Sequence, residues 1–256
     1  MQYPKFERSA IDIHSHFNHG APDEYATAEY LNTSVNTLDF LLSENERFGI
    51  REVAYSSYSA VLGSNHIIEE NRYLNDLIHK DARLFQWAVV HPLQDDTFQQ
   101  VEAMLDDPRV LGIKIHPYFH KYKMVEQADK IFSFANERGA TVMMHPAQTE
   151  EMQRFADKYP HMRLIIAHLA GETEIQAIKH AKHGNIYTDT SGSLSALNNV
   201  IEYACEQIGS EKILFGTDTY SLTFQYSRIA LARISHEDKE NILYKNAIRM
   251  FPKAFS

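Results

Sequence analysis

The sequence is short of the features that mark secreted or membrane proteins. Cys205 is its only cysteine, so no disulfide can form within the chain, and this usage predicts a reducing compartment. The first ten residues, MQYPKFERSA, lack the apolar core of a signal peptide. No stretch approaches the ~20 apolar residues needed to span a bilayer. We therefore expect a cytoplasmic protein that makes no membrane contact.

Positive charge is also scarce. The 256 residues include 25 Lys and Arg against 34 Asp and Glu, which gives a formal net charge of −9, and the basic residues form no cluster. Such a chain repels phosphate backbones at long range, which argues against nucleic acid as a partner. No low-complexity linker and no shift in composition divides the chain. Its length, with 44% hydrophobic residues, suits a single domain over residues 1–256.

Short β-rich runs alternate with amphipathic stretches, whose apolar residues at three- and four-residue spacing predict helices. The expected strands are Ala10–His14, Ile50–Tyr55, Leu84–Val90, Val110–His116, Ala140–His145, Arg163–His168, Asn185–Asp189 and Lys212–Asp218. Eight alternating β and α units in this length are typical of a (β/α)8 TIM barrel, an α/β fold. A doubly wound open sheet shares the alternation and is the alternative. It is weakened because no Gly-x-Gly-x-x-Gly follows the first strand.

Polar residues gather at the carboxyl ends of the expected strands. They are His14 and His16, His91, His116, His145, His168 and Asp218. In a barrel these ends share one face, where active sites are built. Side chains two residues apart share a face of a strand, so His14 and His16 should point the same way, while Ser15 points away and should tolerate alanine. By the same parity Lys114 shares a face with His116.

Imidazole and carboxylate together suit one borderline divalent ion, zinc first, with manganese, iron and nickel as alternatives. Each residue also has an ordinary interpretation. A His-x-His pair can hydrogen-bond in a core, a His-Pro pair can simply end a strand, and Asp218 can cap a helix. The ordinary interpretation must place all of them at one end of six strands by accident. We therefore predict a metal site at this face.

With these residues identified, the chain resembles the amidohydrolase superfamily. Within it, the chain is similar to the amidohydrolase-related (amidohydrolase 2) branch, which contains small metal-dependent hydrolases and aminocarboxymuconate-semialdehyde-type decarboxylases. The matching stretches, in order, are IDIHSH, GIKIHP, MMHP, LIIAHLAG, LFGTDT and ILYKNAIRMF. They extend from residue 10 to residue 251, so the resemblance covers nearly the whole chain.

The resemblance implies roles for the matching positions. His14, His16 and His145 would be metal ligands. Asp218 would bind or approach the metal and act as the catalytic general base. His168 would be the second catalytic residue, polarising a substrate carbonyl or holding an oxyanion.

Strand four differs from the pattern of binuclear relatives. These carry a carboxylated lysine as a bridging ligand, and Lys114 matches that position. We expect Lys114 instead to be an unmodified ammonium that binds a substrate carboxylate, which predicts a site with one ion. His116 and Tyr118 are expected to contact the substrate as well.

The main expectation for the activity is a metal-dependent hydrolase that opens an amide, ester or lactone bond of a small molecule with a metal-activated water. The alternative is a metal-dependent non-oxidative decarboxylase of a small unsaturated or aromatic carboxylic acid. A metal-dependent nuclease would place a glutamate where this chain has Lys114 and His116, and a non-catalytic barrel would not need the metal. Pairing into a homodimer stays open. The stretch Asn18–Asn36 is expected to form a lid, from its length and position.

Overall fold

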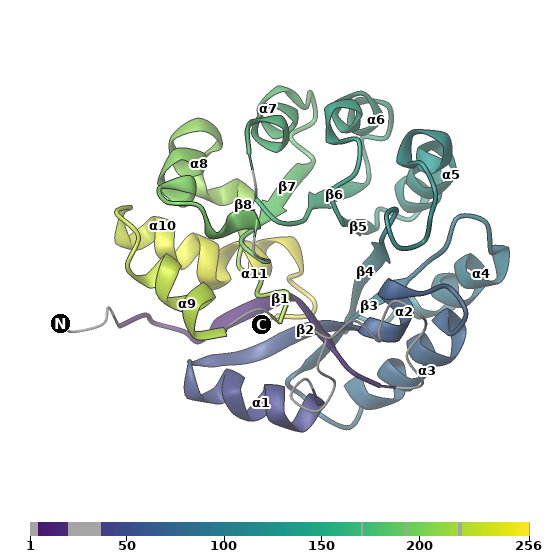
Figure 1. Ribbon diagram of the computed structural model, residues 1–256, viewed down its shortest axis with the longest axis horizontal. Coiled ribbons are helices and arrows are strands. Elements are labelled where there is room, and N and C mark those ends of the chain that lie inside the picture. Colours follow the sequence, from purple (N-terminus) through teal and green to yellow (C-terminus); the bar gives the residue numbers. More distant parts are fainter. Residues whose placement is uncertain (1–4, 20–36, 170, 193, 220–221, 256) are drawn as a thin grey trace.

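The computed structural model describes residues 5–19, 37–169, 171–192, 194–219 and 222–255. Its strands form one eight-stranded parallel sheet in the order β1-β2-β3-β4-β5-β6-β7-β8. Helices lie outside the ring of strands (Figure 1). The predicted single-domain (β/α)8 barrel is therefore confirmed. An open doubly wound sheet is ruled out because neighbours in the sheet are also neighbours in the sequence. Most of the predicted lid, residues 20–36, lies outside the described residues.

The strands are β1 (Ala10–Phe17), β2 (Ile50–Ser57), β3 (Leu84–Val89), β4 (Val110–Ile115), β5 (Thr141–Met144), β6 (Arg163–Ile166), β7 (Ile186–Asp189) and β8 (Ile213–Leu214). The α-helices are α1 (Leu38–Arg47), α2 (Tyr58–Leu62), α3 (Ile67–Ile78), α4 (Asp95–Met104), α5 (Met124–Glu137), α6 (Met152–Lys158), α7 (Glu172–His180), α8 (Val200–Ile208), α9 (Leu222–Ala230), α10 (His236–Glu240) and α11 (Asn246–Met250). Short turns of 3-10 helix are η3 (Thr149–Glu151), η4 (Leu194–Ala196) and η5 (Ser210–Lys212), and η6 (Asn241–Lys245) is a turn of π-helix.

The last strand is shorter than the sequence pattern predicts. The expected strand Lys212–Asp218 is reduced to Ile213–Leu214, because Lys212 ends a 3-10 turn and the backbone leaves the extended region at the other end. Asp218 has φ of 55° and Thr219 has φ of 62°, which lie in the left-handed region that a strand does not accommodate. The first strand is longer than predicted and continues to Phe17.

Backbone hydrogen bonds join the segment that follows β8 to β1 and close the barrel. The Ile13 N–H donates to the Phe215 carbonyl at 2.9 Å. The His14 carbonyl then accepts from the N–H groups of Thr217 (3.1 Å) and Asp218 (2.7 Å). The closure therefore fixes residues from both ends of the chain at the same place.

Two hydrophobic clusters hold the fold together. The main one fills the barrel and the layer between strands and helices, and α5 shows how a helix joins it: its buried residues Ala128, Ile131, Phe132 and Ala135 follow the predicted three- and four-residue spacing. The larger side chains among them, Ile131 and Phe132, each stabilise the fold by about 1.5–3 kcal/mol when fully buried. The smaller cluster, called here the α2 cluster, consists of Tyr58, Ala60, Val61, Leu62, Ile67 and Val89, with Phe119 packed against it. No described helix has the length and hydropathy of a membrane span.

Candidate metal centre

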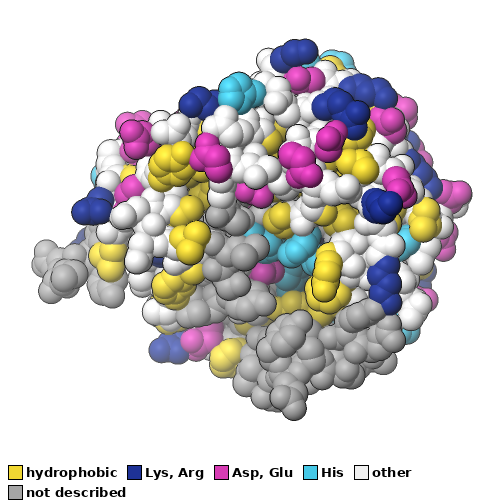
Figure 2. All heavy atoms as spheres, turned by 45° about the horizontal axis from the view of Figure 1, so that its top comes forward, with side chains coloured by type: hydrophobic (Ala, Val, Ile, Leu, Met, Phe, Trp, Pro, Cys, Tyr) yellow, Lys and Arg dark blue, Asp and Glu magenta, His cyan; other side chains and the backbone are white. Residues whose placement is uncertain are grey.

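A cavity of about 90 Å³ opens at the carboxyl ends of the strands, the face that the sequence indicated. Figure 2 shows histidine side chains gathered in a hollow, with hydrophobic side chains beside them. The cavity is lined by His14, His16, Tyr58, Val61, Leu62, Lys114, His116, Phe119, His145, His168 and Asp218. Imidazole, ammonium and carboxylate groups thus share a small space with aromatic and aliphatic side chains.

Three side chains in the cavity bring metal-binding atoms together. His14, His16 and Asp218 each offer one ligand atom, and these atoms all lie within 4.8 Å of one another. Asp218 Oδ1 is 3.1 Å from His16 Nε2 and 3.7 Å from His14 Nε2. Donors that bind a shared ion at about 2.1 Å lie about 3 to 4 Å apart. The donor set and its spacing therefore fit a divalent metal ion.

Both imidazoles are oriented by a partner behind them. His14 Nδ1 is 2.9 Å from Asp189 Oδ2, and His16 Nδ1 is 3.1 Å from the Ser56 carbonyl. Carboxylate and carbonyl oxygens only accept, so Nδ1 carries the proton in each ring and the Nε2 lone pair faces the cavity. Burial lowers the pKa of His14 to about 4 and that of His16 below its ordinary value. Both rings are therefore neutral near pH 7, the form that binds a metal.

The two carboxylates are held in the ionised form. Burial alone would raise the pKa of Asp189 and of Asp218, but the neighbouring imidazoles, His14 beside Asp189 and His168 beside Asp218, outweigh burial and keep both values well below the usual range. Asp189 is fully buried at the end of β7. A second group of three possible donors, His14, His168 and Asp189, also lies within 4.8 Å. Its close spacing follows from the hydrogen bond between His14 and Asp189.

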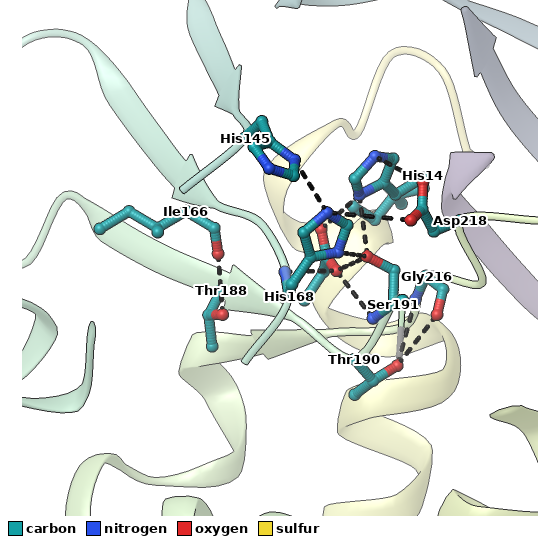
Figure 3. Close-up of polar contacts among 12 residues, drawn as sticks. His14, His145, Ile166, His168, Thr188, Thr190, Ser191, Gly216 and Asp218 are labelled. Carbon is teal, nitrogen blue, oxygen red and sulfur yellow. Dashed lines mark hydrogen bonds and ion pairs between the residues drawn. The ribbon is translucent and has the colours of Figure 1, made fainter. Parts of the chain in front are cut away.

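Ser191 connects the imidazoles of His14 and His168. Its Oγ lies 2.9 Å from Nδ1 of each ring (Figure 3). It also contacts Asp189 Oδ1. The loop after β7 comes this close because residue 192 is a glycine. Its φ is +72°, and a Cβ there would lie 2.7 Å from His168 Nδ1. The absence of a side chain at Gly192 is therefore a requirement of the site.

His168 and His145 lie side by side in the cavity. His168 Nε2 is 3.2 Å from His145 Nδ1 and 3.8 Å from Asp218 Oδ2 (Figure 3). The ring of His145 also stacks on that of His116, with centroids 4.0 Å apart. Among the described residues, the groups of three donors within 4.8 Å do not include His145. The structure thus places this expected ligand in the same cavity but next to His168.

The three residues expected to bind substrate occupy different places. Lys114 is almost fully buried, with Nζ 2.8 Å from His14 Nε2, and burial lowers its pKa to about 8. His116 lines the cavity, and its Nδ1 accepts from the Phe119 N–H at 3.3 Å. Tyr118 is 74% exposed and does not line the cavity, which Phe119 does instead.

The sequence did not single out Phe119, Val61 or Leu62 as lining residues. They lie in a turn and in a five-residue helix, where no strand parity or long helical period marks a buried face. Ser15 is not among the residues that line the cavity, and its Oγ lies 3.0 Å from Thr219 Oγ1.

Solved structures share this fold. A 2,6-dihydroxybenzoate decarboxylase from Rhizobium matches with a TM-score of 0.75 at 14% identity, over 96% of this chain and 99% of that chain. A dihydroxybenzoic acid decarboxylase from Polaromonas, with bound manganese and 2-nitroresorcinol, matches with 0.72 at 16% identity, over 97% and 98%. A 5-carboxyvanillate decarboxylase from Novosphingobium aromaticivorans, with manganese and 4-hydroxy-3-methoxy-5-nitrobenzoic acid, matches with 0.74 at 14% identity, over 96% of each chain. No curated sequence matches significantly.

Two expectations are corrected by this comparison. Hydrolysis of an amide, ester or lactone, the main expectation, is wrong, because the similar structures are mostly decarboxylases and agree with the alternative. Zinc as the first metal is not supported either, since two of these structures hold manganese. The physical reason is that the same imidazole and carboxylate donors serve both reactions and several ions.

The resemblance itself is confirmed. A family model described as amidohydrolase matches residues 11–253, which is nearly the whole chain and includes every donor of the cavity. The chain therefore belongs to this amidohydrolase family of enzymes.

Proposed function

We propose that the protein is a metal-dependent non-oxidative decarboxylase of a small aromatic or unsaturated carboxylic acid. The observation that carries the proposal is the division of the cavity. One part of its lining, called here the polar side, consists of the metal donors and the buried amine of Lys114. A second part, called the apolar side, consists of Tyr58, Val61, Leu62 and Phe119, which pack together. A substrate with a carboxylate at one end and an apolar body at the other matches both sides. The decarboxylases that share the fold act on such acids.

His14, His16 and Asp218 would hold the ion, and manganese is the first candidate. When bound, the ion supplies a Lewis acid that binds substrate oxygen and stabilises negative charge. Lys114 binds the carboxylate as an ammonium, which orients the bond that breaks. The apolar side excludes water around the carboxylate and favours its loss as neutral CO₂.

His168 is assigned the transfer of the proton. In the reaction the bond between the ring carbon and the carboxyl carbon breaks, CO₂ leaves, and the electron pair takes up a proton at the ring carbon. Nε2 of His168 lies in the cavity, and Asp218, 3.8 Å away, stabilises the positive charge of a protonated ring. Ser191 behind it fixes the ring orientation through Nδ1.

The test is a panel of acids and neutral esters offered to the protein loaded with manganese. We expect CO₂ release from at least one hydroxylated aromatic or unsaturated acid, with loss of activity after chelation and recovery with Mn²⁺. The variant His14→Ala serves as the control for metal-independent release. Turnover of a lactone or ester without CO₂, and no release from any acid, would refute the proposal.

A further inference from the structure

The helix α2 supplies most of the apolar side of the cavity, although it is only five residues long. Tyr58, Val61 and Leu62 of this helix line the cavity. A helix this short cannot satisfy its own last carbonyl groups and is not stable by itself. Its position must therefore be fixed by contacts from elsewhere in the chain.

One such contact comes from His120 in the loop between β4 and α5. Its Nε2 lies 2.9 Å from the Ala60 carbonyl and 3.1 Å from the Gly63 carbonyl. Since carbonyl oxygens only accept, Nε2 carries a proton and shares it between the two. These two carbonyls flank Val61 and Leu62. One buried N–H thus fixes the backbone on both sides of two cavity residues.

His120 is itself held firmly on the other loop. The backbone N–H of His120 donates to the His116 carbonyl at 3.0 Å, and the backbone carbonyl of His120 lies 3.3 Å from His91 Nε2. The rings of His91 and His120 lie with their centroids 5.0 Å apart. Its neighbour Phe119 is the fourth apolar residue of the cavity. His120 therefore joins the short helix α2 to the loop between β4 and α5, and these two segments form the apolar side.

We infer that His120 is a positioning residue that sets the shape of the apolar side of the cavity and, through it, the affinity for the apolar body of the substrate. The inference rests on the proposed function for the identity of that substrate. His120 does not line the cavity. Its loss should therefore change KM while leaving kcat and metal binding nearly unchanged.

The main test is His120→Phe, which keeps an aromatic ring against His91 but removes the N–H. With the best acid from the panel, KM should rise about tenfold, the loss expected for one buried hydrogen bond, while kcat stays within about twofold. Acids with larger apolar substituents should be affected more than small ones. The variant His120→Gln, whose amide N–H can reach the same carbonyls, should restore most of the affinity.

Tyr122→Phe is the matched control. Tyr122 lies in the same loop, and its buried hydroxyl has no hydrogen-bond partner among the described residues. Its removal should leave KM unchanged. If His120→Phe does not fold, His120→Asn takes its place, and KM should increase in the order wild type, Gln, Asn.

An unchanged KM in His120→Phe, or a loss of kcat and metal with KM unchanged, would overturn the inference. A binding measurement distinguishes failure of this inference from failure of the proposed function. If no acid in the panel releases CO₂, calorimetric titration of the manganese-loaded protein with benzoate still tests His120. The same tenfold weakening in His120→Phe would support its positioning role, and equal affinities would refute it.

Discussion

The two sides of the cavity are built from different kinds of structure. The polar side stands on the barrel: His14 and His16 belong to β1, Lys114 belongs to β4, and Asp218 is fixed by the bond from its N–H to the His14 carbonyl. The apolar side stands on α2 and on a turn after β4. Strands hold reacting groups within narrow limits, whereas loops vary without disturbing the barrel. The polar groups and the apolar lining therefore belong to different structural elements, so one can be changed by substitution without directly altering the other.

The largest effect should follow from breaking the polar side. His14→Ala or Asp218→Asn removes one of three converging donors, so bound metal should fall from one ion per chain to well below that, and activity should fall more than about 1000-fold. Elemental analysis of the purified variants, beside turnover, checks this. The exposed His161→Ala should behave as wild type. Full metal content in His14→Ala would show that the ion binds elsewhere.

A smaller effect on the same side should follow from Asp189→Asn. The amide no longer accepts a charge-assisted hydrogen bond from His14 Nδ1, so the ring loses its orientation and some of its basicity. Metal affinity should fall roughly 10- to 100-fold, as for other residues that orient a ligand. Competition with a chelating indicator measures it. Unchanged affinity would mean that barrel closure alone orients His14.

Gly192→Ala tests the contact between the loop after β7 and His168. The added Cβ would lie 2.7 Å from His168 Nδ1, so the ring must shift or the loop must move. We expect kcat to fall roughly 10-fold, with metal content retained because His168 is not in the group formed by His14, His16 and Asp218. Measuring kcat and metal content on the same preparation checks this prediction. If the metal content falls together with kcat, metal binding and turnover both depend on this contact.

The smallest effect should come from the apolar side. Phe119→Ala removes a ring that lines the cavity and should raise KM roughly 5-fold with little change in kcat, because the half-buried ring loses less than the about 1.5–3 kcal/mol of a fully buried one. Tyr118→Ala is the neighbouring control, since that ring is 74% exposed and should change neither constant. A larger effect from Tyr118 than from Phe119 would restore the sequence-based expectation that Tyr118 contacts the substrate.

The polar side could be predicted from the sequence because strand ends leave a readable pattern. Apolar residues alternate with polar ones until His14, His116 and Asp218, and a barrel brings all strand ends to one face. Asp218 lies at this face as predicted, although β8 is shorter than the sequence pattern indicated. The barrel's closing bonds place Asp218 beside His14 although its backbone is not extended.

The apolar side could not be predicted in the same way. Val61, Leu62 and Phe119 lie in pieces too short for a period to appear, and their positions depend on His120 some sixty residues from α2 in the sequence. The donor pattern alone also does not distinguish hydrolysis from decarboxylation, because imidazole and carboxylate donors can hold a divalent ion for either reaction. What separates them is the surroundings of the ion.

The barrel closure also sets an order of events during synthesis. Thr217 Oγ1 donates to Asp12 Oδ2 at 2.6 Å, and these residues are 205 positions apart. At 5–20 residues per second, a ribosome needs roughly 10 to 40 s to deliver the second partner after the first. Until then β1 is an unpaired edge on one side, and the histidines it carries lack their carboxylate partner. The three donors His14, His16 and Asp218 can therefore converge only after most of the chain has been synthesised.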